Sequence, residues 1–154
     1  MSSPLSSAQV DPRGQRFAAT ITVVVLAAVL LTAPSTLATV LLALQTALFA
    51  LAVAVGVQRT PYAWLYRTLA RPRLGPPAEL EDAAPPRFAQ GVGLVFAAVG
   101  LVGLLTGVTT LGLVATGFAL VAALLNAAMG LCLGCELYLI VRRVTGGSLL
   151  TSSN

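Results

Sequence analysis

Apolar residues along this chain come in long, almost unbroken runs. Residues 17–32 and 37–57 consist mainly of alanine, valine, leucine and isoleucine, and residues 88–106 and 111–141 repeat the pattern. The first three runs are near the length, about 20 residues, at which a helix crosses a hydrocarbon core of roughly 30 Å. The pattern therefore predicts four transmembrane helices and an all-α fold.

The breaks between the runs predict how the helices connect. Short turns at residues 34–35 and 107–110 join the runs in pairs, so we expect two helical hairpins. The predicted fold class is an integral membrane four-helix bundle. Its domain covers residues 11–144, with disordered tails at residues 1–10 and 145–154.

The last run is too long for one straight span. Residues 111–141 would extend about 46 Å as a helix at 1.5 Å per residue. A strong tilt, a kink near Gly130, or emergence of one end into water would each accommodate the extra length. The sequence leaves these three alternatives open.

The central polar segment, residues 58–87, separates the two hairpins. Its first part, residues 61–69, places two tyrosines and two leucines on one helical face, which suits a short helix lying in the membrane interface. These residues are Tyr62, Leu65, Tyr66 and Leu69. The Arg-Pro-Arg-Leu-Gly-Pro-Pro stretch that follows predicts an extended link, because proline interrupts helices.

Composition agrees with a membrane location. Of the 154 residues, 57% are hydrophobic and 9% are charged, whereas about half of the residues in soluble domains are apolar. A domain of this size still exposes roughly a third of its unfolded surface. The surplus of apolar side chains must therefore face lipid, and we expect the lipid bilayer as a partner.

The nine arginines orient the predicted spans. The chain has no lysine, five acidic residues and a net charge of +4. Neither hairpin turn contains an arginine, so all the positive charge gathers on one side. Because cytoplasmic loops carry the excess of positive charge, we expect both termini and the central loop in the cytoplasm, and the spans in the inner membrane. Arginines at the ends of apolar runs do not form a nucleic-acid-binding stripe.

Two further patterns bear on packing. The third run and the residue that follows it contain five glycines, of which Gly100, Gly103 and Gly107 predict a smooth face that a neighbouring helix approaches closely. In addition, each hairpin opens with the same three residues, Arg-Phe-Ala, at positions 16–18 and 87–89. This match favours parallel repeats, although Arg-Phe is also a good interfacial start by itself.

The candidate chemistry lies in residues 130–138, which read Gly-Leu-Cys-Leu-Gly-Cys-Glu-Leu-Tyr. They contain both cysteines of the chain, Cys132 and Cys135, followed by Glu136. A spacing of three places the two thiols on adjacent turns of one helical face, within the separation that a disulfide tolerates. Such a pair can cycle between dithiol and disulfide. Glu136 is then a candidate proton acceptor.

Depth in the membrane follows from counting back along one helix from Arg142. This places Cys135 about 10 Å and Cys132 about 15 Å below the headgroups, so that Cys132 is near the midplane. A carboxylate in the apolar layer is costly, so Glu136 is expected to be protonated, hydrogen-bonded or paired with an arginine. The candidate partners are Arg16, Arg87 and Arg142.

Packing explains the same cysteines about as well. Gly130 and Gly134 form a small-residue face on which cysteine packs readily. Two thiolates and one carboxylate would hold a soft metal only if water or another chain completed the shell. The chain has no histidine, which excludes histidine-based metal sites and Ser-His-Asp triads.

The remaining polar side chains within the spans have simpler interpretations. Gln45 is expected to face another helix and not lipid, and Asn126 is expected to hydrogen-bond between helices. Tyr138 is expected to be packed or interfacial, with a role in proton transfer as the alternative.

Three stretches carry a resemblance to a known family. They are Val10-Asp11-Pro12-Arg13 to Arg16-Phe17, Pro85-Pro86-Arg87-Phe88-Ala89-Gln90, and Gly130-Leu131-Cys132-Leu133-Gly134-Cys135-Glu136-Leu137-Tyr138. Here the chain resembles a bacterial membrane family known as domain of unknown function 4395 (DUF4395), over nearly all of residues 10–143. The family has no assigned activity. The resemblance implies that its signature positions are occupied by Cys132, Cys135, Glu136, Arg87 and Arg16.

The resemblance also suggests partners and a location. Family members look to be encoded near thioredoxin-like and sulfurtransferase proteins, which implies a cytoplasmic partner of that kind and a bacterial membrane. The chain is more distantly similar to four-span thiol oxidoreductases of the vitamin K epoxide reductase type, in span number and in its membrane C-x-x-C. Those enzymes use a second cysteine pair, whereas this chain has two cysteines in total.

Three functions remain open from the sequence. The first is a thiol-redox or sulfur-handling protein in which the cysteine pair exchanges electrons with a thioredoxin-like partner or a quinone. The second is a non-enzymatic accessory or scaffold subunit whose glycine-rich faces pack in a larger membrane complex. The third is a small transporter, acting as an oligomer, with Glu136, Asn126 and Gln45 along a path. The sequence leaves open which cofactor, if any, the protein uses and whether it is an enzyme.

Overall fold

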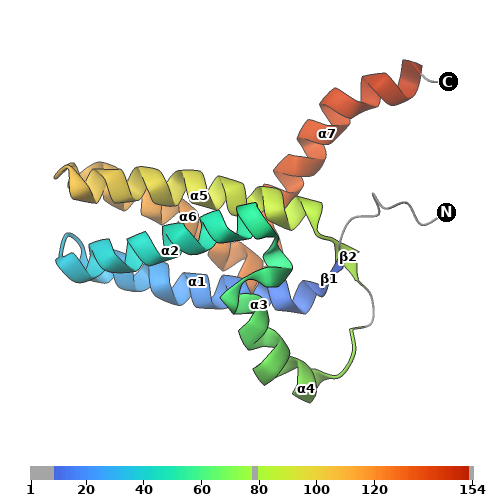
Figure 1. Ribbon diagram of the computed structural model, residues 1–154. Coiled ribbons are helices and arrows are strands. Elements are labelled where there is room, and N and C mark those ends of the chain that lie inside the picture. Colours follow the sequence, from blue (N-terminus) through green and yellow to red (C-terminus); the bar gives the residue numbers. More distant parts are fainter. Residues whose placement is uncertain (1–8, 78–79, 153–154) are drawn as a thin grey trace.

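Four long helices form the body of the protein (Figure 1). The computed structural model describes residues 9–77 and 80–152. Of the helices in these ranges, four are long and apolar enough to cross a membrane, which fits a multi-pass membrane protein. They are α1 (Pro12–Thr32), α2 (Thr36–Val55), α5 (Ala84–Leu105) and α6 (Thr109–Met129). The predicted all-α fold with four apolar helices is confirmed.

The helices are arranged as two hairpins. Figure 1 shows them side by side, with both hairpin turns at one end of the bundle. The opposite end, where α1 and α5 begin and α2 and α6 end, is called the polar end below. In space α1 packs mainly on α6, and α2 on α5, so each hairpin contacts the other along both of its helices.

A capping side chain marks the start of each helix of the first hairpin. The Asp11 side chain accepts a hydrogen bond from the Arg13 backbone N–H, and Pro12 occupies the first helical position, where its missing N–H costs nothing. The Ser35 side chain accepts from the Ala38 N–H and begins α2 directly after the cis Ala33–Pro34 bond. The Ser35 cap thus lets α2 begin at Thr36, four residues after α1 ends at Thr32.

Most apolar side chains of the four helices point outward. Only 17% to 28% of the residues in the most apolar stretch of each helix are buried inside the protein. The small core lies between the hairpins. Its buried members are Leu26, Val29, Ala38, Leu42, Phe49, Ala97 and Ala119. A surface with this many exposed leucines, valines and phenylalanines needs lipid as its solvent.

Helices α5 and α6 approach closely at glycines. A Cβ atom placed on Gly103 would lie 2.6 Å from the Gly112 backbone nitrogen, and one on Gly100 would lie 2.8 Å from the Thr116 hydroxyl oxygen. The predicted smooth face is therefore present at Gly100 and Gly103. Gly107 does not belong to it, because that glycine lies in the hairpin turn with φ +83° and open space around it.

The two hairpins hold each other through equivalent arginines at the polar end. Arg16 of α1 donates to two carbonyl oxygens in the last turn of α6, at 3.2 and 3.3 Å. Arg87 of α5 donates to two carbonyl oxygens in the last turn of α2, at 2.7 and 3.1 Å. Each arginine thus satisfies the free carbonyls at the end of a helix in the other hairpin. The Arg-Phe-Ala repeat therefore corresponds to a repeated contact.

The long last run is divided at Gly130. Helix α6 ends at Met129, and Gly130 adopts φ +68°, a left-handed conformation that glycine tolerates best. The Gly130 and Leu131 N–H groups donate back to carbonyl oxygens of α6, at 2.9 and 3.2 Å. Helix α7 (Leu133–Ser152) then leaves the bundle at a new angle (Figure 1). Of the three alternatives left open by the sequence, the structure has the break near Gly130, and residues 111–141 do not form one continuous helix.

Both predicted tails need correction. Residues Gln9–Val10 form strand β1, which pairs antiparallel with β2 (Glu81–Asp82). At the other end, α7 continues to Ser152, so the stretch from residue 145 is helical and not disordered over that range. Residues 1–8 and 153–154 lie outside the described part of the chain.

The central segment is more helical than predicted. The expected helix is present as α3 (Pro61–Leu65) and continues through a π-helical turn, η2 (Tyr66–Ala70), after the short 3₁₀ turn η1 (Val57–Arg59). The expected extended link is wrong at α4 (Arg71–Leu74). Pro72 fits there because it is near the helix start, where an N–H is not needed. An interfacial placement of α3 stays a prediction.

We predict that Gly103→Ala destabilises the bundle by about 1–3 kcal/mol, because the added methyl group overpacks the α5–α6 contact. Thermal unfolding in detergent micelles measures the change. Gly117→Ala is the matched control, since a Cβ at that position of α6 meets nothing within 4 Å. Equal midpoints for the two variants would contradict the close contact.

Candidate functional site

The two cysteines form a disulfide at the beginning of α7. Their Cα atoms are 5.1 Å apart. Cys132 directly precedes the helix, and its sulfur accepts a hydrogen bond from the Cys135 N–H at 3.1 Å. The Cys132 carbonyl oxygen accepts another from the Glu136 N–H at 3.0 Å. Cys132 thus occupies the N-cap of α7, and when reduced its thiolate would be stabilised by this N–H and the positive end of the helix dipole.

The disulfide lies at the polar end of the bundle. Gly134, between the two cysteines, fits directly against α5: a Cβ atom there would lie 2.5 Å from the Ala89 Cβ. A Cβ on Gly130 would be 3.8 Å from the Arg16 side chain. The predicted position of Cys132 near the midplane is therefore wrong, because counting along one straight helix fails where the chain leaves α6 and turns into α7.

Glu136 does not pair with an arginine in the described part of the chain. Its side chain is exposed in the first turn of α7, where the helix dipole favours a negative charge. Arg16 and Arg87 instead donate to backbone carbonyls, and Arg142 is exposed. Tyr138 packs on Phe88, with ring centroids 5.5 Å apart, which confirms the prediction of a packed side chain.

An apolar cavity of about 250 Å³, called the chamber below, lies beside the disulfide. Cys132, Leu133, Gly134 and Leu137 form one side of it, and Cys135 does not line it. The other walls come mainly from α1, α5 and α6. Among the described residues, none that lines the chamber carries a formal charge.

Five polar side chains line the chamber besides Cys132. They are Gln15, Thr22, Tyr62, Gln90 and Asn126. Of these five residues, only Asn126 was proposed from the sequence as a site residue. The signal for the glutamines was present, since Gln15 precedes the first Arg-Phe pair and Gln90 follows the second by two residues. The tertiary fold brings both to one cavity.

Gln45 lies deeper in the bundle and outside the chamber's lining. It is fully buried, and its Oε1 accepts a hydrogen bond from the Tyr62 hydroxyl at 2.7 Å. The Gln45 Nε2 has no partner among the described residues. The prediction that Gln45 faces another part of the protein and not lipid is confirmed. Burial raises the pKa of Tyr62, and hydrogen bonds with Thr22 and Gln45 oppose this only in part.

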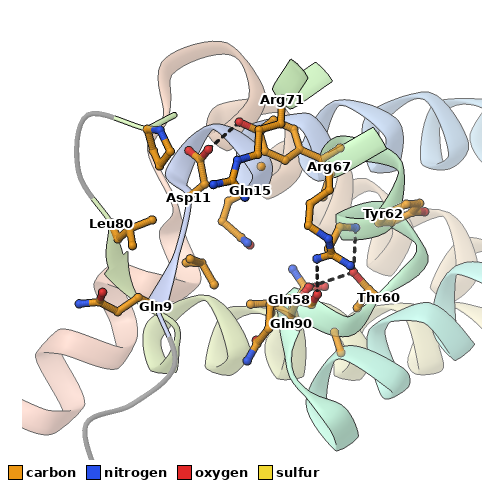
Figure 2. A pocket seen from close by; sticks show the side chains of 18 of the residues that line it. Gln9, Asp11, Gln15, Gln58, Thr60, Tyr62, Arg67, Arg71, Leu80 and Gln90 are labelled. Carbon is orange, nitrogen blue, oxygen red and sulfur yellow. Dashed lines mark hydrogen bonds between the residues drawn. The ribbon is translucent and has the colours of Figure 1, made fainter. Parts of the chain in front are cut away.

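A second cavity of about 290 Å³ lies under the central segment at the polar end (Figure 2). We call it the polar cavity. Arg67 and Arg71 line it, and Arg67 donates to the Gln58 carbonyl oxygen at 2.7 Å. It shares Gln15, Ala18, Tyr62 and Gln90 with the chamber. The two cavities are therefore neighbours separated by a wall of these side chains.

Asp11 is the fixed negative charge on the wall of the polar cavity. Its carboxylate forms an ion pair with Arg13 at 2.9 Å and accepts a hydrogen bond from the Tyr66 hydroxyl at 2.7 Å. Burial alone would raise the pKa of Asp11, but the hydrogen bonds from Arg13 and Tyr66 outweigh it and hold the pKa below the ordinary 3.8. Burial and the Asp11 contact raise the pKa of Tyr66.

Comparison with known proteins gives a family. Residues 10–143 match the family described as "Domain of unknown function (DUF4395)". The chain belongs to the DUF4395 family. The DUF4395 match covers all four long helices, the central segment and the part of α7 that carries the disulfide. A search of the curated proteins found no significant match, and neither did a search of the solved structures.

We predict a pH-dependent role for Asp11 in this DUF4395 protein. Because its pKa is lowered on folding, its contribution to stability is fully present above pH 3.8 and is lost as the pH falls through the folded-state value. Asp11→Asn keeps the N-cap oxygen but removes the ion pair with Arg13, so it should cost up to about 1 kcal/mol at pH 7 and progressively less below pH 4. Thermal unfolding from pH 7 to pH 3 measures this. Glu81→Gln, which removes the same charge from the exposed strand β2, is the control and should have little effect on stability at pH 7, and a constant Asp11→Asn difference would contradict the assignment.

We also predict that Gly134 fixes the disulfide against α5. In Gly134→Ala the new methyl group would overlap Ala89, so α7 must move away, at a cost of about 1–3 kcal/mol. Adding Ala89→Gly should not restore the stability, because the backbone Cα of residue 89 would still lie 2.6 Å from the new methyl group. Unfolding midpoints of the single and double variants measure both effects. A Gly134→Ala variant as stable as the wild type would show that α7 does not pack here.

Proposed function

We propose that this protein is a membrane thiol-disulfide redox protein whose reversible centre is the Cys132–Cys135 pair. The observation that carries the proposal is the position of the pair. Cys132 caps the beginning of a 20-residue helix, and the same residue lines the chamber. A helix N-terminus favours the thiolate, which is the reactive form of cysteine.

The proposed reaction is a dithiol-disulfide exchange with a thioredoxin-like protein. The Cys132 thiolate attacks the partner's disulfide and forms a mixed disulfide, and the partner's other sulfur leaves as a thiolate that takes up a proton. The Cys135 thiol then loses its proton, attacks the Cys132 sulfur and releases the partner as a dithiol. Glu136, exposed one residue beyond Cys135, is the proposed acceptor of that proton. The partner is reduced by two electrons, and the Cys132–Cys135 disulfide forms.

The charge distribution supports a cytoplasmic setting for this end of the protein. Both hairpin turns lack arginine, whereas Arg16, Arg87 and the arginines of the central segment lie toward the polar end. By the positive-inside rule, the proposal places the polar end and both termini in the cytoplasm, in a bacterial inner membrane. Thiols are kept reduced in the cytoplasm, so a disulfide exposed there is typically catalytic or redox-sensing. A sulfurtransferase is the alternative class of partner.

The other two functions have less support. The glycine face expected to dock a larger complex is occupied within the chain, where Gly100 and Gly103 contact α6. A transport path through Glu136, Asn126 and Gln45 is not favoured either. Asn126 lines the chamber, Glu136 is exposed, and Gln45 lines neither cavity.

We predict a single two-electron transition for the cysteine pair. Purified protein in lipid nanodiscs is equilibrated with mixtures of reduced and oxidised dithiothreitol, and free thiols are counted by alkylation and mass measurement. Molecules with no tag and with two tags should interconvert as the ratio changes. Cys132→Ser/Cys135→Ser is the control for tag specificity. A tag count that stays the same in strong oxidant and in strong reductant would refute the proposed function.

A second experiment assigns the two sulfurs. The probe is a thioredoxin-like protein whose second cysteine is replaced by serine and whose remaining cysteine carries a thionitrobenzoate leaving group; Cys135→Ser should displace it and accumulate the mixed disulfide through Cys132, because neither protein then has a second sulfur to resolve it. Cys132→Ser should accumulate at least tenfold less, since Cys135 lacks the N-cap position. Equal trapping by both variants would contradict the assignment of Cys132 as the attacking sulfur.

A further inference from the structure

The chamber beside Cys132 is too small for the thioredoxin-like partner proposed above. It has a volume of about 250 Å³ and is lined largely by alanines, phenylalanines and leucines. No folded protein enters a cavity of this size. In the residues that the structure describes, its lining also lacks any formal charge, so an anionic ligand would have no counterion there. A small, neutral and largely apolar ligand fits it best.

The chamber reaches the surface that faces lipid. Phe96 of α5 and Phe118 of α6 both line it, and their rings lie 5.9 Å apart. Phe118 is 60% exposed and Phe96 is 36% exposed. These two side chains therefore connect the inside of the chamber to the outer face of the bundle. A ligand dissolved in the bilayer could enter between α5 and α6 with its apolar tail left in lipid.

Carboxamides supply the chamber with free hydrogen-bond donors. Gln15, Gln90 and Asn126 line it from three different helices, α1, α5 and α6. Within the described part of the chain, the amide groups of these side chains make no hydrogen bond to the protein, whereas Gln45 nearby is bonded to Tyr62. Carboxamide N–H groups donate to carbonyl oxygens. A ligand with carbonyl groups would satisfy them.

These properties are combined in one class of lipid-soluble redox molecule. From them we infer that the chamber binds the head group of a membrane quinone, which exchanges electrons with Cys132–Cys135. The inference rests on the proposed function and names the second substrate of that centre. The flat ring fits between apolar side chains and its two carbonyl oxygens accept from the carboxamides. Cys132 is the member of the cysteine pair that lines the chamber.

The electron count of the two couples matches. When the dithiol meets a quinone, the two S–H bonds break and the S–S bond forms. Two electrons and two protons pass to the two quinone oxygens, which gives a quinol. The exchange described above then runs in reverse: a dithiol of the thioredoxin class attacks the Cys132 sulfur from the aqueous side, Cys135 leaves as a thiolate, and the pair is reduced again while the partner becomes a disulfide. Cys132–Cys135 thus connects a thiol reductant in water with an oxidant in lipid, and a second cysteine pair in the chain is not needed.

Binding is tested with decylubiquinone, whose fully substituted ring leaves thiols no free ring position to add to. The quinone should raise the unfolding midpoint of detergent-solubilised oxidised protein, and of Cys132→Ser/Cys135→Ser as well, because the sulfurs do not hold the ring. Gln90→Leu and Asn126→Leu should each weaken binding at least tenfold. Gln58→Leu, in the polar cavity but outside the chamber, should bind as the wild type does. Decylbenzene, which lacks carbonyls, should have little effect.

Electron transfer is tested by mixing the reduced protein with decylubiquinone under anaerobic conditions. The loss of quinone absorbance should match the loss of free thiols, one quinone per pair, and Gln90→Leu should slow it at least tenfold at a limiting quinone concentration. The inference is overturned if decylubiquinone does not bind, if it binds equally well to Asn126→Leu and wild type, or if bound quinone leaves both thiols reduced. In each of these cases the dithiothreitol titration still reports separately on the proposed function.

Discussion

The left-handed turn at Gly130 is the constraint on which the candidate site depends. A helix that continued through this position would carry the cysteines along the bundle axis. Instead Gly130 adopts a left-handed conformation that ends α6, and Cys132 becomes the N-cap of α7. The turn costs little because glycine has no Cβ to clash at positive φ. Without it, neither the N-cap geometry of Cys132 nor the wall that α7 gives the chamber would exist.

The close fit of α7 on α5 sets the direction in which α7 leaves the turn at Gly130. Gly134 lies so near Ala89 that even one methyl group between them would overlap, and Tyr138 packs on Phe88 one turn further along. An equivalent contact occurs at the end of the first hairpin, where Tyr66 packs on Phe17 with centroids 5.7 Å apart. In each half, a tyrosine from the segment after the hairpin therefore packs on a phenylalanine of the first helix of that hairpin. The first helix of each hairpin also carries an arginine that donates to carbonyl oxygens at the end of a helix in the other hairpin. The repeat organises the whole polar end.

The division between the two cavities has a chemical consequence. Arginines line the polar cavity but not the chamber, and the glutamines and Tyr62 form the wall between them. Charged reactants are favoured on one side of this wall, and neutral, lipid-soluble ones on the other. Cys132 lines the chamber, and neither cysteine lines the polar cavity. The proposed redox role therefore pairs a neutral ligand inside the chamber with a protein partner that approaches from outside it.

The sequence by itself determined the four apolar helices, their pairing in hairpins, the DUF4395 membership and the cysteine pair, because hydrophobic run length and local motifs suffice for these. It also indicated the break at Gly130 through the excess length of the last run. It misplaced Cys132 in depth, because that count assumed one straight helix. It also offered Arg16, Arg87 and Arg142 as possible partners of Glu136, of which Arg16 and Arg87 in fact cap helices. Only the tertiary structure decided that Gln15, Gln90 and Asn126 meet beside Cys132. Those residues lie on three helices far apart in the chain, and their meeting depends on how the hairpins pack, which no local pattern encodes.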